Sequence, residues 1–122
     1  IGMGKAILGA RILVMGMTFK ENVADIRNSK VVDIINELKD FGVEVDVVDP
    51  YADPEEVKKM YGFRLIEKPL GNYDAVVVAV AHDAYQGLDE KYFKSLTCDK
   101  AVLVDVKGMY RDKIHELKYW SL

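Results

Sequence analysis

The apolar residues of this chain follow two patterns that alternate along it. Short continuous or β-branched apolar runs are typical of strands buried in a parallel sheet, and four of them occur, over residues 10–16, 43–48, 74–81 and 100–106. Residues 63–66 form a weaker run that predicts a short edge strand. The chain is therefore expected to contain four core strands and one at an edge.

Helices are predicted between these runs. After Ser29, apolar side chains recur at intervals of three and four, which predicts a helix with one buried face that Asn28 or Ser29 caps. A second, short helix is expected from Pro54 to Met60, with Gly62 closing it. Strands and helices thus alternate in the first half of the chain.

The second half continues this alternation. Residues 88–96 predict a helix with Asp89 as its cap, and the apolar positions after residue 109 predict a final helix or an arm packed on the sheet. Such an order favours an α/β fold in three layers, with a doubly wound, mostly parallel, Rossmann-like sheet. We expect residues 1–9 to be the end of a preceding segment or a linker, and residues 10–122 to be one domain.

Composition narrows the possible partners. Half of the residues are hydrophobic and 30% are charged, as in ordinary globular domains, and the net charge of −3 favours neither nucleic acid nor a membrane surface. A single cysteine, Cys98, cannot form an intrachain disulfide and fits the reducing cytoplasm. No group of Cys and His has the spacing of a metal site. The chain starts at Ile1 instead of a methionine, which indicates a piece of something longer.

The segment from Gly16 to Ser29 offers the most chemistry. It follows a strand, precedes a helix and carries Lys20 and Arg27, and ligands of open parallel sheets lie outside the carboxyl ends of the strands. Lys107 follows the last core strand and should lie at the same edge. The alternative interpretations are a solvated loop lysine at position 20 and a loop ion pair between Arg27 and Asp25.

Three other residues have chemistry that could serve a site. Asp49 follows the second strand, where dinucleotide-binding folds place an acid for ribose, but residues 16–21 lack the G-x-G-x-x-G sequence that this role requires. His82 follows the third core strand without an accompanying nucleophile or ligand set, and is expected to be a loop residue near the crevice. Cys98 precedes the last strand, at the opposite edge from Lys20, and is interpreted as non-catalytic.

Two motifs carry a resemblance to a known family. Phe19-Lys20 followed by Asp25-x-Arg27-x-Ser29, together with Val-Asp-Val-Lys-Gly at 104–108, resembles the C-terminal domain of the UDP-glucose/GDP-mannose dehydrogenases. The resemblance implies that Phe19, Lys20 and Lys107 contact a UDP-sugar, although many members have arginine at the last position. Phe19 could instead belong to the core. Arg27 would reach the pyrophosphate of NAD held by another domain.

The resemblance also implies the reaction of the whole enzyme. It is an NAD-dependent oxidation of the sugar C6 alcohol to the uronate, and its catalytic cysteine lies in a motif that this chain lacks, so no residue here is catalytic. The implied partners are the N-terminal and central domains of the same chain, with a homodimer when full length and a role in polysaccharide biosynthesis. Residues 17–22 look closest to the branch that acts on UDP-N-acetylated hexosamines.

Two other interpretations remain open at this point. One is a stand-alone nucleotide-binding or regulatory module. The other is a phosphoacceptor receiver domain, which is disfavoured because Met17 and Thr18 occupy the place of the required acidic pair.

Overall fold

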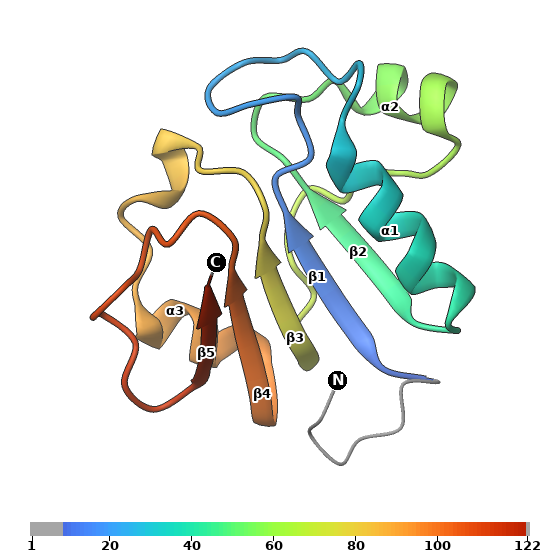
Figure 1. Ribbon diagram of the computed structural model, residues 1–122. Coiled ribbons are helices and arrows are strands. Elements are labelled where there is room, and N and C mark those ends of the chain that lie inside the picture. The colour runs from blue at the N-terminus through green and yellow to red at the C-terminus, as the bar shows by residue number, and fades with distance from the viewer. Residues whose placement is uncertain (1–8, 122) are drawn as a thin grey trace.

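A five-stranded, all-parallel sheet forms the centre of the molecule (Figure 1). The computed structural model describes residues 9–121. In spatial order the strands are β2 (Glu44–Val48), β1 (Arg11–Met15), β3 (Tyr73–Val78), β4 (Thr97–Asp105) and β5 (Lys118–Ser121). The chain direction across the sheet reverses between β1 and β3, as in doubly wound folds, so the predicted α/β class is confirmed.

The three predicted helices are present, with ends set by local hydrogen bonds. They are α1 (Lys30–Asp40), α2 (Pro54–Tyr61) and α3 (Glu90–Leu96), and a 3₁₀ turn, η1, covers Asp83–Tyr85. Asp89 caps α3 as predicted, because its carboxylate accepts the N–H of Tyr92 at 2.9 Å. Ser29 occupies the N-cap position of α1, but its hydroxyl donates to the carbonyl of Met17 at 2.6 Å instead of capping the helix.

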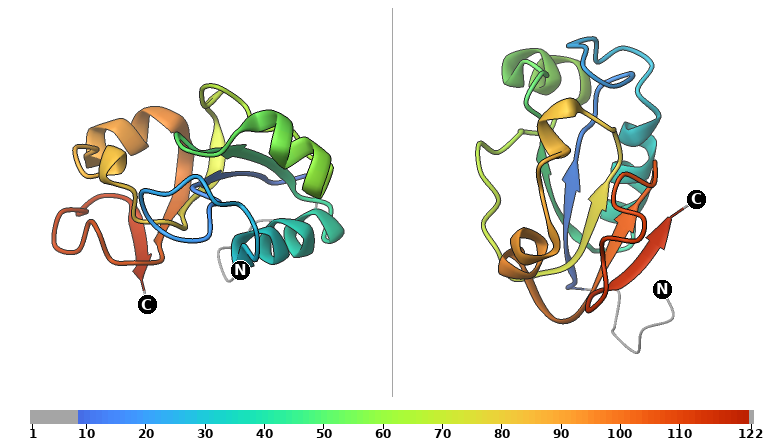
Figure 2. Two further views of the ribbon diagram at one scale, coloured as in Figure 1. Left: turned by 90° about the horizontal axis from the view of Figure 1, so that it is seen from above. Right: turned by 90° about the vertical axis from the view of Figure 1, so that its left-hand side faces the viewer.

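Two hydrophobic clusters cover the two faces of the sheet, and Figure 2 shows α1 and α3 on opposite sides of it. The first cluster joins α1 and α2 to the strands through Ile35 and Val57, both fully buried. The second contains Phe93 of α3 and Tyr110, whose rings meet edge-on with centroids 5.1 Å apart. Every central strand is thus buried on both faces, which explains its continuous apolar sequence.

The structure corrects two expectations about sheet edges. Residues 63–66 form no strand, and their one ladder-like bond runs from the Ile66 N–H to the Val47 carbonyl at 2.9 Å. Phe63 packs in the first cluster and Ile66 with the second, so this segment passes around the edge of β2 and does not run along it. The tail forms the fifth strand, β5, where a final helix or an arm was expected.

Boundaries differ by a few residues elsewhere. The run 74–81 ends as a strand at Val78, and β4 begins at Thr97, before the predicted start at residue 100. Among residues 9–121, no helix has the length and apolar character needed to span a bilayer. The predicted linker over residues 1–9 lies almost wholly outside the described residues.

Candidate functional site

A hollow of about 340 Å³ opens at the carboxyl edge of the sheet, on the side that α1 covers. Its walls come from the loops after β1, β3 and β4 and from the first turns of α1, which is the reversal point where doubly wound folds bind ligands. It is lined by Thr18, Phe19, Lys20, Glu21, Asn28, Lys30, Val31, Ile34, Ala79, Val80, Val106 and Lys107. The structure therefore brings together Phe19, Lys20 and Lys107, three of the four residues selected from the sequence.

The two lysines keep their charges available to a ligand. Lys20 and Lys107 are exposed, and neither forms an ion pair within residues 9–121. Phe19 is 55% exposed, so the alternative that it belongs to the core is wrong. Ile34 of α1 is 43% exposed and lines the same hollow. Two cations beside an apolar wall suit a ligand that combines an anionic group with a flat or apolar one.

A buried carboxylate holds the start of the loop that carries Lys20. The side chain of Asp49, just after β2, is fully buried. It accepts four backbone N–H groups, those of Met17, Thr18, Tyr51 and Ala52, at 2.7 to 3.3 Å. Because these donors occupy both of its oxygens, Asp49 has no capacity left for a ribose, in agreement with the missing dinucleotide sequence.

His82 is the residue that sequence reasoning underestimated. It follows β3 as expected, yet its side chain is fully buried and not simply a loop residue beside the crevice. Its Nδ1 accepts the backbone N–H of Asn22 at 2.9 Å, so the proton of the neutral ring lies on Nε2, 3.0 Å from an Asp49 oxygen. The rings of Tyr51 and Tyr85 pack on the imidazole with centroids 4.7 and 5.5 Å away.

A second buried carboxylate shapes the turn that carries Lys107. Asp105, the last residue of β4, is fully buried and accepts the backbone N–H groups of Met109 at 3.0 Å and Tyr110 at 2.7 Å. The Tyr119 hydroxyl donates to it as well, at 2.5 Å. The start of each cationic loop is therefore held by a carboxylate whose hydrogen bonds come from neutral donors, and neither carboxylate pairs with a lysine within residues 9–121.

Arg27 lies on the outer side of its loop and does not line the hollow. Its guanidinium forms two hydrogen bonds with the Asp25 carboxylate, each 3.0 Å long, while 74% of the side chain stays exposed. These hydrogen bonds lower the pKa of Asp25 and raise the pKa of Arg27. The predicted loop ion pair is thus confirmed, and the structure separates Arg27 from the other three selected residues.

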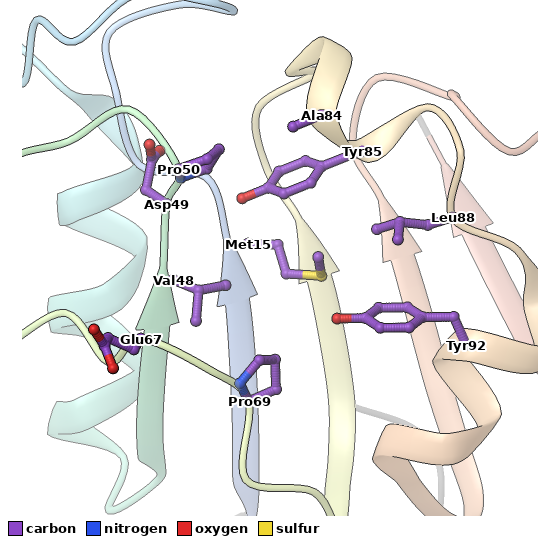
Figure 3. A pocket seen from close by; sticks show the side chains of 10 residues that line it. All are labelled: Met15, Val48, Asp49, Pro50, Glu67, Pro69, Ala84, Tyr85, Leu88 and Tyr92. Carbon is purple, nitrogen blue, oxygen red and sulfur yellow. The ribbon is translucent and has the colours of Figure 1, made fainter.

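A second pocket, of about 270 Å³, lies on the α3 side (Figure 3). It is lined mostly by apolar side chains, and the Tyr85 hydroxyl inside it is buried without a hydrogen-bond partner among residues 9–121. Burial, followed by the charge of Asp49, raises the pKa of this tyrosine. None of the four selected residues lines this pocket, so it is separate from the hollow. Cys98, near the amino end of β4, lies at the opposite edge, with its sulfur 3.2 Å from Asp74.

Comparisons with known proteins agree with the fold and the motifs. Residues 13–112 match the UDP binding domain of the UDP-glucose/GDP-mannose dehydrogenase family. A UDP-N-acetyl-D-glucosamine 6-dehydrogenase of Pseudomonas aeruginosa is 39% identical over 111 residues, 90% of this chain and 26% of the relative. Protein CapL of Staphylococcus aureus is 43% identical over 107 residues, 87% of this chain and 25% of the relative.

A solved structure shows the same fold in a longer protein. The NDP-N-acetyl-D-galactosaminuronic acid dehydrogenase of Methanosarcina mazei superposes with a TM-score of 0.79 at 23% identity, covering 97% of this chain and 25% of that one. The chain spans about a quarter of the length of the curated relatives named above. On the family match and these identities, the chain belongs to the UDP-glucose/GDP-mannose dehydrogenase family and corresponds to its C-terminal, UDP-binding domain.

Proposed function

We propose that this chain is the nucleotide-sugar-binding domain of an NAD-dependent 6-dehydrogenase that oxidises a UDP-sugar to its uronate. Residues 10–122 form the domain, and residues 1–9 link it to central and N-terminal domains that supply the catalytic cysteine and the NAD fold. The full-length enzyme is a cytoplasmic homodimer in this proposal. The relatives named UDP-N-acetyl-D-glucosamine 6-dehydrogenase favour an N-acetylhexosamine as the sugar.

One observation carries the proposal: Phe19, Lys20 and Lys107, selected from separate motifs, line a single hollow. The diphosphate of a UDP-sugar carries its negative charge between an aromatic base and a sugar. Two ammonium groups without ion pairs match the diphosphate, and the exposed ring of Phe19 with Ile34 offers an apolar surface to the uridine. The start of α1 adds a positive dipole end to the same wall.

The cofactor role of Arg27 is a separate part of the proposal. NAD, when bound, accepts hydride in each of the two oxidations. The chain has no glycine-rich loop for a pyrophosphate, so its contribution is limited to the exposed Arg27. Asp25 occupies Nε and one terminal nitrogen of the guanidinium, which leaves the other terminal nitrogen to donate to a phosphate oxygen presented by a second domain. Asp25 would thereby hold the guanidinium of Arg27 in a fixed orientation.

Replacement of Lys20 by alanine in the full-length enzyme tests the substrate site. We expect kcat/KM for the UDP-sugar to fall by about tenfold or more, since a hydrogen bond to a charged group contributes about 1.5–3 kcal/mol. The KM for NAD should stay the same. Lys91→Ala, at an exposed lysine of α3 on the opposite face, is the matched control and should leave both constants unchanged.

Direct binding separates the diphosphate from the base. Calorimetric titration of the 122-residue chain should show weaker binding of uridine than of UDP, and Lys107→Ala should reduce the difference. Equal kinetics of Lys20→Ala and the unmodified enzyme would remove Lys20 from the site and would contradict the proposal.

A further inference from the structure

We propose that His82 and Asn22 are positioning residues that hold the substrate loop, residues 16–22, in its binding conformation. The inference rests on the proposed function, because it assigns these residues to the placement of Lys20. Neither side chain lines the hollow itself, so neither is expected to touch a ligand there.

The substrate loop is tied down at both of its ends. At its beginning, the Asp49 carboxylate accepts the N–H groups of Met17 at 2.7 Å and Thr18 at 3.3 Å. At its far end, the backbone N–H of Asn22 donates to His82 Nδ1 at 2.9 Å. Phe19 and Lys20 lie between these two ties, both exposed, and Lys20 has no ion pair within residues 9–121. Between the ties, the Phe19 N–H also donates to the Asp25 carbonyl at 2.8 Å, so the position of Lys20 depends on this bond together with the groups that lie behind the loop.

Asn22 closes the far end with a second bond. Its side-chain oxygen accepts the backbone N–H of Asp83 at 2.8 Å, so backbone and side chain of one residue both bind the turn after β3. The backbone of Asn22 has φ of 62°, a left-handed conformation that asparagine tolerates better than most residues. Asn22, an exposed asparagine with two specific hydrogen bonds to the turn after β3, is thus suited to hold the far end of the substrate loop.

The two ties are connected through one imidazole. His82 Nε2 donates to the Asp49 oxygen that also accepts Met17, at 3.0 Å. Thr18 adds a link inside the loop, since its hydroxyl donates to the carbonyl of Lys20 at 2.9 Å and lies 3.3 Å from His82 Nε2. Because the histidine is fully buried between two tyrosine rings, it cannot rotate away without disturbing both ends of the loop.

Two substitutions at position 82 separate the bonds of the imidazole. His82→Gln places an amide N–H near the former Nε2, so it keeps a donor for Asp49 and removes the acceptor for Asn22. His82→Asn places an oxygen near the former Nδ1, so it keeps the acceptor for Asn22. In the full-length enzyme we expect kcat/KM for the UDP-sugar to fall about tenfold for the glutamine variant, within the ~100-fold that a displacement of about 1 Å can cost. The asparagine variant should lose clearly less.

Asn22→Gly provides a variant on the surface that should not disturb folding. Glycine accepts the left-handed backbone and removes only the bond to Asp83. Asn72→Gly is the matched control. Asn72 is also exposed and has φ of 58°, but it precedes β3 and so lies at the amino-terminal edge of the sheet, opposite the hollow. We expect Asn22→Gly to raise the KM for the UDP-sugar with little change in the KM for NAD, and Asn72→Gly to change neither.

Double variants show whether the effect passes through Lys20. In a Lys20→Ala background, His82→Gln and Asn22→Gly should cause a smaller further loss than in the unmodified enzyme, since Phe19 is then the one proposed ligand contact between the two ties that they still position. Fully additive losses, or losses that merely follow a drop in Tm, would overturn the positioning role. If Lys20→Ala itself has no effect, the proposed function fails. If it has its effect and the Asn22 and His82 variants do not, only this inference fails.

Discussion

Gly16 is the residue at which β1 passes into the substrate loop, and its replacement by alanine tests how tightly this junction is packed. Its φ is +92°, and a Cβ placed there would lie 2.7 Å from Val80 Cβ and 3.0 Å from Val80 N. Both of these atoms are fixed by the backbone, so a change of rotamer at Val80 cannot relieve the contact. The loop or the segment just after β3 would have to move.

Gly16→Ala should lower the free energy of unfolding for two reasons, and the same substitution at a second glycine separates them. The left-handed backbone costs alanine about 1–2 kcal/mol, and overpacking adds about 1–3 kcal/mol, which gives a loss of about 2–5 kcal/mol for Gly16→Ala. Gly62, after α2, has φ of +84°, and a Cβ at this position would meet no atom within 4 Å, so Gly62→Ala carries only the backbone part. Gly62→Ala should therefore cost about 1–2 kcal/mol.

Urea unfolding followed by circular dichroism measures both losses. The midpoints should fall for both variants at unchanged m-values, and more for Gly16→Ala. Gly16→Ala should also weaken UDP binding, because the displaced residues include Lys20. Equal losses of unfolding free energy in the two variants would refute the packing argument.

Two further predictions concern stability away from the site. Glu90 accepts the backbone N–H groups of residues 115–117, which lowers its pKa below the usual 4.5, the bond from residue 117 contributing most. A carboxylate whose pKa is lowered by folding stabilises the folded state at pH values above its unfolded pKa. The difference in unfolding free energy between the unmodified chain and Glu90→Gln should therefore be full at pH 7 and shrink as the pH falls below 4.5. Urea melts at several pH values measure this difference. Tyr73→Phe removes a hydroxyl that donates to Asp46 at 2.7 Å and accepts the Leu70 N–H at 3.0 Å, and should cost about 1–3 kcal/mol in the same assay.

Local sequence was enough to predict the core strands and helices because their signals agree with the tertiary structure. The run before Gly16 is buried, the helix after Ser29 buries Val32 and Ile35 on one face, and Asp89 caps its helix. The edge elements could not be predicted in the same way. Residues 63–66 have strand-like composition, but the need to cross from one face to the other at β2 decides their path.

Some residues of the candidate site could likewise be predicted from the sequence, and others could not. Lys20 and Lys107 follow the ends of parallel strands, so topology alone places them at one edge, and the structure adds that they share a hollow. The roles of Asp49 and His82 depend on backbone N–H groups of a loop, which carry no sequence signature. The available signal was their position: each is a polar residue shortly after a strand that neighbours β1, the strand that leads into the substrate loop.

The strand order has a consequence for the stage of folding at which the hollow forms. β1 pairs with β3 at Ile12 and Ala75, a longer sequence separation than the pairing of Arg11 with Glu44 or of Val102 with Lys118. Closing a long loop costs entropy before its contacts form, so we expect the junction of β1 and β3 to assemble late in folding. The hollow lies at that junction, and no separate part of the chain contains its walls. UDP should therefore select the completely folded sheet and protect the whole domain, including the distant amino ends of its strands, against unfolding.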